Sequence, residues 1–487
     1  MHYAAISDSL SRPKGDAYAD KLRRRTISVD RSAPTPDVRL AGERTNGMSK
    51  RQELRTPRNG APFSRRSLLA GAAAGATALS LGSRSRRVSA TQGSNGEVNV
   101  LYLADQHDHF KTVAEAFTAE TGIGVKYETL PSDYLSGQQL LTTRLVAGDT
   151  DLDVFWCDDF QSAMYGAAGW LEPLDPIVEE FGIQLDDYVP TLITDVSTWD
   201  GALYRLPWTA EPELIFYRTD YFEEAGVELP ANWDEFVTVA TALTNGSDRY
   251  GIGLCGQKAG TLGNEIQHWA NQAGGAINAL DTEGSKQAIT FYKDLFTTHK
   301  VAPPSTPQED YNTVLQGFLD GKYAVWWVWD VFFAAMTTDE TFWKDQVSVM
   351  VPQMAGPQNA ETSIGCWGWA INGFSGRKDQ AKQWVEFTSR PEIMKHQMLR
   401  GNAPARTSLW ADPEYQERAP QLSFMAQMIE GGESPFRARP VTPGIQEIYD
   451  AAEQNVHAFL TDQVDLDTAV AQAMEKIRPI LERYSAD

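Results

Sequence analysis

Val98-Asn99-Val100-Leu101-Tyr102-Leu103 opens the part of the chain that decides the fold, because short apolar runs alternate there with amphipathic segments. The opening run is typical of a buried strand, and the apolar side chains of residues 110–117 then recur at helical spacing. Residues 124–127 predict a second strand, 134–147 a second helix and 153–156 a third strand. This β-α-β-α-β order predicts an α/β fold with a parallel, doubly wound sheet and right-handed crossovers.

Polar side chains follow the first and third of these predicted strands. Residues 105–108 read Asp-Gln-His-Asp, and Cys157, Asp158 and Asp159 come directly after the third strand. Ligands of doubly wound sheets bind beyond the carboxyl ends of the strands. We therefore expect ligand contacts among the residues at these two strand ends, which include Asp158 and His107. For His107 the alternative is a loop residue that hydrogen-bonds only to the backbone.

The rest of the chain is richer in helix and shows no internal repeat. Helical spacing covers six segments: 233–243, 265–273, 285–298, 311–319, 446–460 and 467–481. Strand-like runs occupy 347–351 and 366–372. The part that follows residue 90 has about 400 residues, which is too long for one small domain and suits two domains that share a cleft.

An export signal lies at residues 64–90. Two adjacent arginines, Arg65-Arg66, precede a run of Ala, Gly, Leu and Ser over 68–82, and 88–90 read Val-Ser-Ala, which a signal peptidase accepts. The run is shorter than the roughly 20 residues that a membrane-spanning helix needs. It resembles a twin-arginine signal, so we expect the twin-arginine translocon to export the folded protein and the mature chain to start near Thr91.

The segment before the signal, residues 1–63, is polar and basic. It is rich in Arg, Pro and Ser and has no apolar periodicity, so we expect a disordered leader. Met48 is an alternative start, which would leave a short basic leader ahead of the arginine pair.

Charge changes sign between the leader and the rest of the chain. Residues 1–90 hold 18 Lys and Arg against 7 Asp and Glu, a net +11, whereas the whole chain has −22, so the remainder carries −33. An acidic surface repels nucleic acid and anionic lipid, and we expect neither as a partner.

The three cysteines, Cys157, Cys255 and Cys366, are too few and too scattered to predict a disulfide framework or a metal site. At most one pair can form, and the spacing leaves open whether any does. No cysteine lies near the end of the signal, so the lipobox of a lipoprotein is missing. We expect a soluble, extracytoplasmic or periplasmic protein without metal or cofactor.

Tryptophans beside polar residues supply the binding chemistry that the sequence predicts. Sugars stack their C–H faces on flat aromatic rings while carboxylates, amides and guanidinium groups bind their hydroxyls. The alternative is that each ring fills the core, and it is favoured for Trp326 and Trp327 in an apolar run. Of the 14 tryptophans, four stand at strand ends or turns: Trp156, Trp208, Trp329 and Trp367.

Several motifs, in order along the chain, resemble the carbohydrate-binding group of extracellular solute-binding proteins that serve ABC importers. The N-terminal motifs are Phe117-Thr118-Ala119-Glu120-Thr121-Gly122-Ile123 and Ala168-Gly169-Trp170-Leu171-Glu172-Pro173-Leu174. The central block runs from Gly201-Ala202-Leu203-Tyr204-Arg205-Leu206-Pro207 through Ile215-Phe216-Tyr217-Arg218 to Asn232-Trp233-Asp234-Glu235-Phe236. The C-terminal motifs are Phe318-Leu319-Asp320-Gly321-Lys322, Ile364-Gly365-Cys366-Trp367-Gly368-Trp369 and Arg437-Ala438-Arg439-Pro440-Val441-Thr442-Pro443, the last resembling a loop of trehalose- and maltose-binding proteins.

The resemblance implies two α/β lobes that close on a ligand by bending at a hinge. It places lobe one at 97–207 with 362–412, and lobe two at 208–361 with 413–487. It also implies a sugar ligand of di- or oligosaccharide size, delivery to the membrane permease subunits of an ABC transporter, and action as a monomer without catalysis. The implied ligand contacts are Asp158, Trp208, Glu211, Trp329, Trp367 and Arg439, with Glu265, Trp269 and His107 as further candidates; for Glu265 the alternative is a charge on a helix surface.

Two departures from the family pattern leave the substrate open. Cys366 replaces a usual glycine, and Gln106-His107 stands where several disaccharide binders carry a glutamate. A polyamine is the alternative solute, because Asp158, Asp159 and Glu211 would suit cationic ends. A glycosidase is the other alternative, but carboxylate pairs are inevitable among so many acidic residues, and no Gly-x-Ser-x-Gly or His-Glu-x-x-His motif occurs.

Overall fold

The computed structural model describes most of the chain after residue 95. The described residues are 96–103, 107–131, 134–258, 260–336, 340–350, 362–398, 402–419, 421–429 and 436–484. Contacts divide the chain into two units, Met1–Arg87 and Val88–Asp487, and all described residues belong to the second. The predicted leader at 1–63 and the export signal at 64–90 lie outside the described residues, so both stay predictions.

The first sheet has five strands in the order β2-β1-β3-β12-β6. Its strands are β1 (Glu97–Leu103), β2 (Gly124–Leu130), β3 (Val154–Asp158), β6 (Leu206–Pro207) and β12 (Trp367–Ile371). β1 pairs in parallel with β2 and β3, which confirms the predicted β-α-β-α-β start. β12 arrives from much later in the sequence and pairs antiparallel to β3 and β6.

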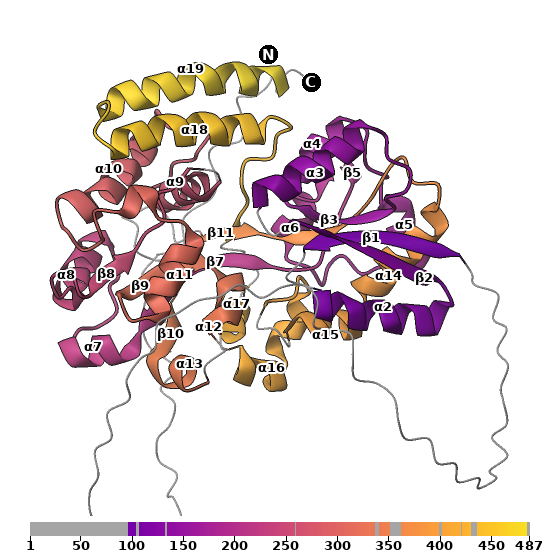
Figure 1. Cartoon of the computed structure of the whole chain (residues 1–487), viewed down its shortest axis with the longest axis horizontal. Helices are drawn as coiled ribbons and strands as arrows, with labels where there is room; N and C mark the ends of the chain where they lie inside the picture. The colour runs from indigo at the N-terminus through magenta and orange to yellow at the C-terminus, as the bar shows by residue number, and fades with distance from the viewer. Residues whose placement is uncertain are drawn as a thin grey trace, which may run out of the picture. The chain divides into compact units, whose positions relative to one another are not determined.

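Helices cover both faces of this sheet (Figure 1). α3 and α4 lie on one face, and α2 and α14 on the other. Because strand side chains alternate, Val100 packs in the same core cluster as Phe110 of α2, and Leu101 packs in the cluster that holds Leu141 and Leu145 of α3. The helices are α2 (His107–Thr121), α3 (Tyr134–Val146), α4 (Gln161–Ala167), α5 (Asp175–Phe181), α6 (Pro190–Thr194), α14 (Lys378–Ser389) and α15 (Pro391–Met398).

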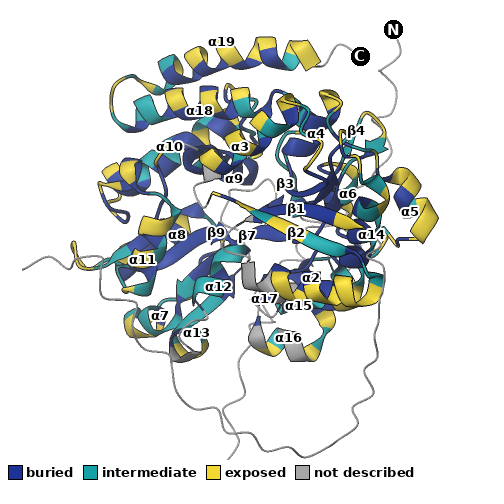
Figure 2. Ribbon diagram, turned by 45° about the vertical axis from the view of Figure 1, so that its right-hand side comes forward, coloured by how far each residue is buried: buried dark blue, intermediate teal, exposed yellow. Residues whose placement is uncertain are grey.

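The second sheet has six strands, ordered β13-β11-β7-β9-β8 with β10 also paired to β7. The strands are β7 (Glu211–Arg218), β8 (Tyr250–Gly253), β9 (Tyr323–Trp329), β10 (Val347–Met350), β11 (Thr362–Gly365) and β13 (Phe436–Arg437). Figure 2 shows β7 and β9 as buried strands. Trp326 and Trp327 of β9 are 0% and 2% exposed, which confirms their predicted place in the core.

The remaining elements are mostly helices, several of which start at a side-chain cap. Asn232 accepts a hydrogen bond from the Glu235 backbone N–H at the start of α8, and Asp310 does the same for Thr313 at α11. α18 packs against both α9 and α19. The helices are α7 (Thr219–Ala225), α8 (Trp233–Leu243), α9 (Thr261–Gln272), α10 (Glu283–Thr297), α11 (Tyr311–Leu319), α12 (Phe333–Met336), α13 (Glu340–Gln346), α16 (Pro413–Arg418), α17 (Gln421–Ile429), α18 (Ile445–Leu460) and α19 (Leu466–Tyr484). Short elements are β4 (Thr198–Trp199), β5 (Ala202–Leu203), η2 (Thr306–Gln308), η3 (Asp330–Phe332) and η4 (Thr407–Ala411).

Two antiparallel segments cross from one sheet to the other. β6 leads into β7, and β11 leads into β12 through the single residue Cys366. The crossings are joined, because the Trp367 N–H donates to Thr209 Oγ1 at 2.9 Å and the Thr209 N–H donates to the Trp367 carbonyl at 3.1 Å. β11 pairs with β7 and β13 of the second sheet, so this crossing lies at Cys366 and not before residue 362.

All three cysteines are buried free thiols in this structure. Within the described ranges, no helix is both long enough and apolar enough to cross a membrane.

Candidate ligand site at the strand crossings

The two crossings bring acidic and aromatic residues from distant parts of the chain into register. Trp367 of β12 lies opposite Asp158 of β3, and Gly365 of β11 lies opposite Glu211 of β7. Asp158 is the last residue of β3, so the structure places it at the carboxyl end of its strand as the sequence predicts. The candidate site is built outward from these two pairs.

Asp158 and Asp159 form a buried acidic pair that faces Arg439. The two residues are 3% and 1% exposed. Arg439 Nη2 lies 3.9 Å from Asp158 Oδ1, and Arg439 Nε lies 3.5 Å from Asp159 Oδ1. Burial raises the pKa of Asp159 to about 6, against the opposing effect of the Arg439 charge. Among the described residues, neither oxygen of Asp159 accepts a well-formed hydrogen bond, so both suit hydroxyl donors of a ligand.

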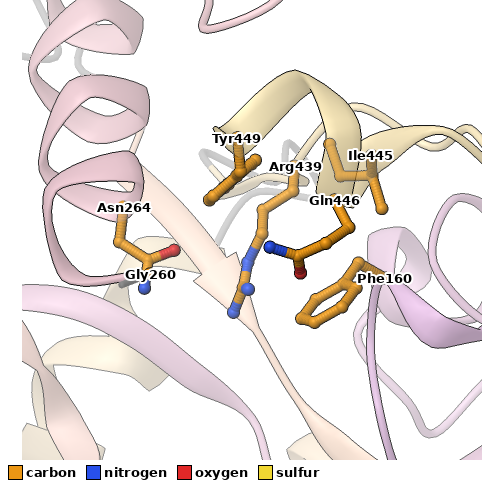
Figure 3. A pocket seen from close by; sticks show the side chains of 7 residues that line it. All are labelled: Phe160, Gly260, Asn264, Arg439, Ile445, Gln446 and Tyr449. Atoms are coloured by element: carbon orange, nitrogen blue, oxygen red, sulfur yellow. The ribbon is translucent and has the colours of Figure 1, made fainter. Parts of the chain in front are cut away.

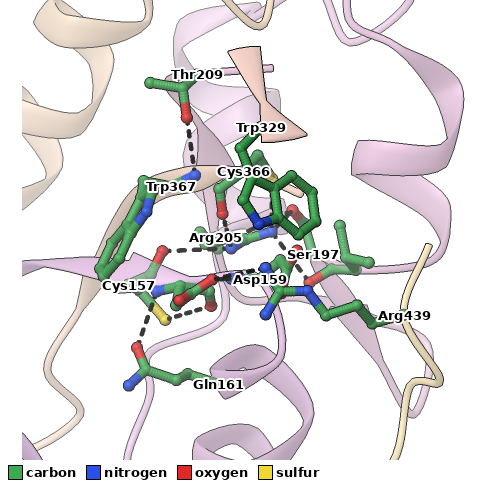
Figure 4. Close-up of polar contacts among 12 residues, drawn as sticks. Cys157, Asp159, Gln161, Ser197, Arg205, Thr209, Trp329, Cys366, Trp367 and Arg439 are labelled. Atoms are coloured by element: carbon green, nitrogen blue, oxygen red, sulfur yellow. Dashed lines mark hydrogen bonds and ion pairs between the residues drawn. The ribbon is translucent and has the colours of Figure 1, made fainter. Parts of the chain in front are cut away.

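Two aromatic rings flank the Arg439 guanidinium. Its Cζ lies 5.1 Å from the ring centroid of Trp329 and 5.5 Å from that of Phe160. Trp329 is held in turn by Tyr311, whose hydroxyl accepts a hydrogen bond of 3.3 Å from the indole Nε1. Figure 4 shows Trp329 and Arg439 beside Asp159. The arginine is therefore fixed by two rings and two carboxylates, with an orientation suited to binding oxygen atoms.

Gly365 is the point on which three of these side chains converge. A Cβ built on Gly365 would lie 3.0 Å from Arg439 Nη2, 3.0 Å from Asp159 Oδ2 and 3.4 Å from Trp329 Cζ3. Any larger residue would displace the arginine or the aspartate, so the site depends on the absence of a side chain at this position.

Trp367 offers a half-buried indole beside the acidic pair. Its ring centroid lies 5.2 Å from that of Trp156, which is 2% exposed and supports it from the core side. Cys366, which precedes it, is buried under the site, where Arg205 Nη2 donates to its sulfur at 2.9 Å. Trp367 can therefore stack on a ligand, whereas Cys366 lies beneath the site and contacts Arg205.

Glu211 adds a third carboxyl group on the opposite strand. Burial raises its pKa to about 8, a hydrogen bond with Thr209 opposes this, and the charges of Asp158 and Asp159 raise it further. At neutral pH Glu211 is therefore mainly a neutral carboxylic acid that can both donate and accept hydrogen bonds. The pKa of Asp330, which follows β9, is also raised well above its usual value by burial, with Glu211 adding to the effect.

A pocket opens next to Arg439 (Figure 3). Its space is about 340 Å³, including a part open to solvent. Within the described structure, the Tyr449 hydroxyl and Asn264 Oδ1 are buried without a hydrogen-bond partner, and Tyr449 is only 7% exposed. The pocket is lined by Phe160, Gly260, Asn264, Arg439, Ile445, Gln446 and Tyr449. It extends the site beyond Arg439 with two aromatic rings, Phe160 and Tyr449, and the amides of Asn264 and Gln446.

Glu453 of α18 joins the two helices that form a wall of this pocket. Its Oε1 accepts hydrogen bonds from the backbone N–H groups of Gly260 and Gly263, at 2.7 and 2.8 Å. These groups stand at the start of α9, where backbone donors lack helical partners. A carboxylate of α18 thus caps α9.

Two predicted contacts lie in the core of the protein. Trp208 is fully buried between Phe110 and Trp369, with ring centroids 6.1 Å from each. Trp269 is 1% exposed and packs 4.8 Å from Trp327. The surroundings of both rings fit a core-filling tryptophan better than a ligand contact. His107 begins α2, but its side chain lies outside what the structure describes.

Glu265 belongs to a buried polar cluster behind the site and not to a helix surface. Its Oε2 accepts a hydrogen bond of 3.2 Å from Trp269 Nε1 and lies 3.7 Å from His268 Nε2. His268 Nδ1 contacts Glu213 of β7. Burial raises the pKa of Glu265 to about 8 and lowers that of His268 to about 4. These groups are shielded from solvent, and they support β7 and α9 from within.

The arrangement fits the binding of a hydroxyl-rich solute. Asp159 and Glu211 provide hydrogen-bond acceptors or donors, Arg439 provides a planar donor, and Trp329 and Trp367 provide apolar faces. In the described residues, no group of three or more His, Cys, Asp or Glu side chains is arranged to hold a metal ion.

Sequence reasoning missed several residues that the structure brings to the site. Phe160, Asn264 and Tyr449 carry no motif, and only their three-dimensional proximity to Arg439 identifies them. Asp159 stands at the same strand end as Asp158, and this position is the signal in the sequence that indicates it.

Comparison with known proteins agrees with this architecture. The sequence profile described as bacterial extracellular solute-binding protein matches residues 104–395. The erythritol/L-threitol-binding protein of Mycolicibacterium smegmatis is 26% identical over 360 residues, which cover 66% of this chain and 71% of that protein.

Two solved structures share the fold. T. maritima MalE3 with bound maltose has a TM-score of 0.72 and 24% identity, covering 79% of this chain and 100% of that chain. An ABC transporter solute-binding protein from Agrobacterium vitis S4 with bound D-mannitol has a TM-score of 0.67 and 25% identity, covering 80% and 99%. These likenesses confirm the predicted two-lobed α/β fold.

Proposed function

Because this chain belongs to the bacterial extracellular solute-binding protein family, we propose that it is the solute-binding component of an ABC transporter and that its solute is a sugar or polyol. The observation that carries the proposal is the Arg439 guanidinium, held between two aromatic rings and two buried carboxylates. Paired aromatic faces and convergent hydrogen-bonding groups are what a sugar or polyol requires. Similarity to an erythritol/L-threitol-binding protein supports the same class.

The pocket beyond Arg439 favours a ligand of disaccharide size within this class. Asp158, Asp159 and Trp367 lie on one side of the arginine, and Asn264 and Tyr449 line the space next to it. One solute could engage both areas only if it extends past the guanidinium. We propose that Trp329 and Trp367 stack on the solute and that Asp158, Glu211 and Arg439 bind its hydroxyl groups.

A polyamine remains the second candidate, favoured by the three carboxyl groups Asp158, Asp159 and Glu211. Two observations weigh against it. Arg439 already places a positive charge beside the aspartates, and burial keeps Glu211 mainly protonated at neutral pH. The site therefore offers little net negative charge to a cation.

A ligand panel on the purified mature protein tests the proposal. We would measure thermal shifts with maltose, trehalose, D-mannitol, ribitol, erythritol and putrescine, and analyse each mixture for reaction products. We expect at least one sugar or polyol at about 1,000 times its Kd to raise Tm by several degrees with no product. A shift with putrescine alone would overturn the solute class, and product formation would indicate a glycosidase.

Ligand binding should also close the lobes. We propose lobe one at 97–207 with 366–412 and lobe two at 208–365 with 413–487, so the boundary expected at residue 362 moves to Cys366, because β11 pairs with β7 and β13 of the second sheet. A solute that contacts both lobes stabilises the closed form. The radius of gyration from solution scattering should fall on adding the solute that binds, and unchanged scattering would contradict closure.

The proposal also covers the export of the protein, its oligomeric state and its transporter partner. We propose twin-arginine export, release into the extracytoplasmic space, action as a monomer and delivery of the solute to ABC permease subunits. A mass close to one chain by light scattering would support the monomer, and a dimer mass would contradict it.

A further inference from the structure

Arg205 is a fully buried cation that lies behind the candidate site. It follows the β4–β5 hairpin and stands directly before β6, and it is 0% exposed. The partners to which it donates hydrogen bonds in the described part of the chain are all neutral: Val196 O, Ser197 Oγ, Cys157 O, Cys366 O and Cys366 Sγ. A buried charge without a directly paired carboxylate is costly unless a nearby opposite charge compensates for it.

Two of these partners are the residues immediately before site residues. Nη1 donates to the Cys157 carbonyl at 3.2 Å and to the Cys366 carbonyl at 3.0 Å. Asp158 follows Cys157, and Trp367 follows Cys366. The same nitrogen thus links the end of β3 to the start of β12, as the contacts of Arg205 with Cys157 and Cys366 in Figure 4 show. At this point Asp158 and Trp367 lie opposite each other.

The space around Arg205 leaves its guanidinium little freedom. A Cβ on Gly368 of β12 would lie 2.9 Å from Arg205 Cγ, so the side chain packs closely under this strand. The forked group therefore holds a fixed position below the acidic pair. A lysine could keep the charge, but one ammonium group cannot reproduce hydrogen bonds to both carbonyls and the sulfur.

We infer that Arg205 is a positioning residue of the site, whose buried charge compensates Asp159 from below while its fork holds β3 and β12 in register. Asp159 then lies between two arginines: Arg439 faces it from the ligand side, and Arg205 faces it from the core side. Arg439, Asp158 and Arg205 are charged groups that shift the pKa of Asp159, and both arginines lower it against the effect of burial. Glu211, Tyr449, Cys157 and Cys366 are titratable groups whose pKa the Asp159 charge raises in turn. The role of Arg205 in solute binding rests on the proposed function. The electrostatic interaction between Arg205 and Asp159 does not.

The test needs no ligand, so its failure is distinguishable from failure of the proposed function. We would compare Arg205→Gln, which removes the charge and keeps two donors, with Arg205→Lys, which keeps the charge and loses the fork. Melting temperatures would be measured from pH 4.5 to pH 7.5, with each substitution also made in an Asp159→Asn background.

The pH dependence separates the electrostatic role from a structural one. At pH 4.5 Asp159 is protonated, so Arg205→Gln loses only packing and hydrogen bonds. At pH 7.5 Asp159 is ionised in the wild type, and the loss of Tm should be about 1.5 °C larger, which corresponds to roughly one pKa unit for Asp159 in a folded unit of about 400 residues. This extra loss should disappear in the Asp159→Asn background and be absent in Arg205→Lys. A loss of Tm that is the same at both pH values would overturn the inference.

The outcome is decisive even if Arg205→Gln does not fold at neutral pH. If the charge is the cause, Arg205→Gln with Asp159→Asn should yield folded protein where the single variant does not. Failure of both variants at both pH values would show that Arg205 acts only as a structural residue.

Discussion

Replacing Gly365 with alanine perturbs the candidate site with one added methyl group. The new Cβ would lie 3.0 Å from both Arg439 Nη2 and Asp159 Oδ2 and 3.4 Å from Trp329 Cζ3. Ordinary van der Waals contacts of a Cβ atom begin at 3.4 Å. The side chains of Arg439 and Asp159 must therefore each move by a few tenths of an ångström. Overpacking of this kind costs about 1–3 kcal/mol.

The cost should fall mainly on binding and not on folding. Arg439 is a flexible side chain and can yield in the protein alone, but a bound solute needs the guanidinium and the Asp159 carboxylate in place together. We expect Gly365→Ala to raise Kd by about 10-fold, within roughly 5- to 150-fold, and to lower Tm only slightly. Isothermal titration with the best solute of the panel, together with thermal melts, measures both quantities.

Gly376→Ala is the matched control. Gly376 is exposed, and a Cβ there would meet no atom within 4 Å, so both Kd and Tm should stay at their wild-type values. A Gly365→Ala protein that binds within twofold of the wild type would refute the reasoning, because the three side chains would then not need their observed positions.

Three further predictions concern stacking, protonation and export. Trp367→Ala should weaken binding by about 2 kcal/mol or more with a modest loss of Tm, because this ring is only half-buried, whereas Trp208→Ala should lower Tm strongly and leave the affinity of the folded fraction nearly unchanged; calorimetric titration and melts on both variants decide. Because the folded-state pKa of Glu211 is raised to about 8, the folded protein holds a proton that the unfolded chain has lost, so this group makes stability fall as pH rises from about 5 to 8. Glu211→Gln should therefore gain stability relative to the wild type over that window, and melts with a pH-independent difference would contradict the shift. Changing Arg65-Arg66 to Lys-Lys should leave precursor in the cytoplasm, and unchanged export in a fractionation experiment would reject the twin-arginine assignment.

Local patterns predicted the secondary structure well, because each element carries its own periodicity. The apolar spacing of 233–243 and 311–319 gave the bounds of α8 and α11, and the alternation of short runs gave the parallel pairing of β1, β2 and β3. The two-residue strands β6 and β13 are too short to show a pattern. They exist because their partners β12 and β11 arrive from elsewhere in the sequence.

The candidate site was predictable only in part. Asp158 was indicated by its position at a strand end, Trp329 and Trp367 by their place beside polar residues, and Arg439 by the resemblance. Trp208 looked equivalent to Trp367 in sequence, since both stand beside polar residues, but burial separates them. No local signal distinguishes a tryptophan that faces a cleft from one that fills a core.

The sequence could not predict residues whose role depends on neighbours that are distant along the chain. Arg205 lies far along the chain from Cys366, and only the antiparallel crossing brings its guanidinium under that sulfur. Gly365 is one of 38 glycines, and its importance follows from the three side chains around it and not from its neighbours in sequence.

The carboxylate of Glu453 has a consequence for engineering this protein as a biosensor. Because it binds the first backbone amides of α9 from within α18, the two helices should travel as one rigid wall when the lobes move. Substitutions at Asn264 or Tyr449 can therefore retune what the pocket recognises while the wall keeps its shape. Changing Glu453 itself would remove this polar link and leave only packing between the two helices, so a reporter dye on either helix should follow the motion of the other less closely.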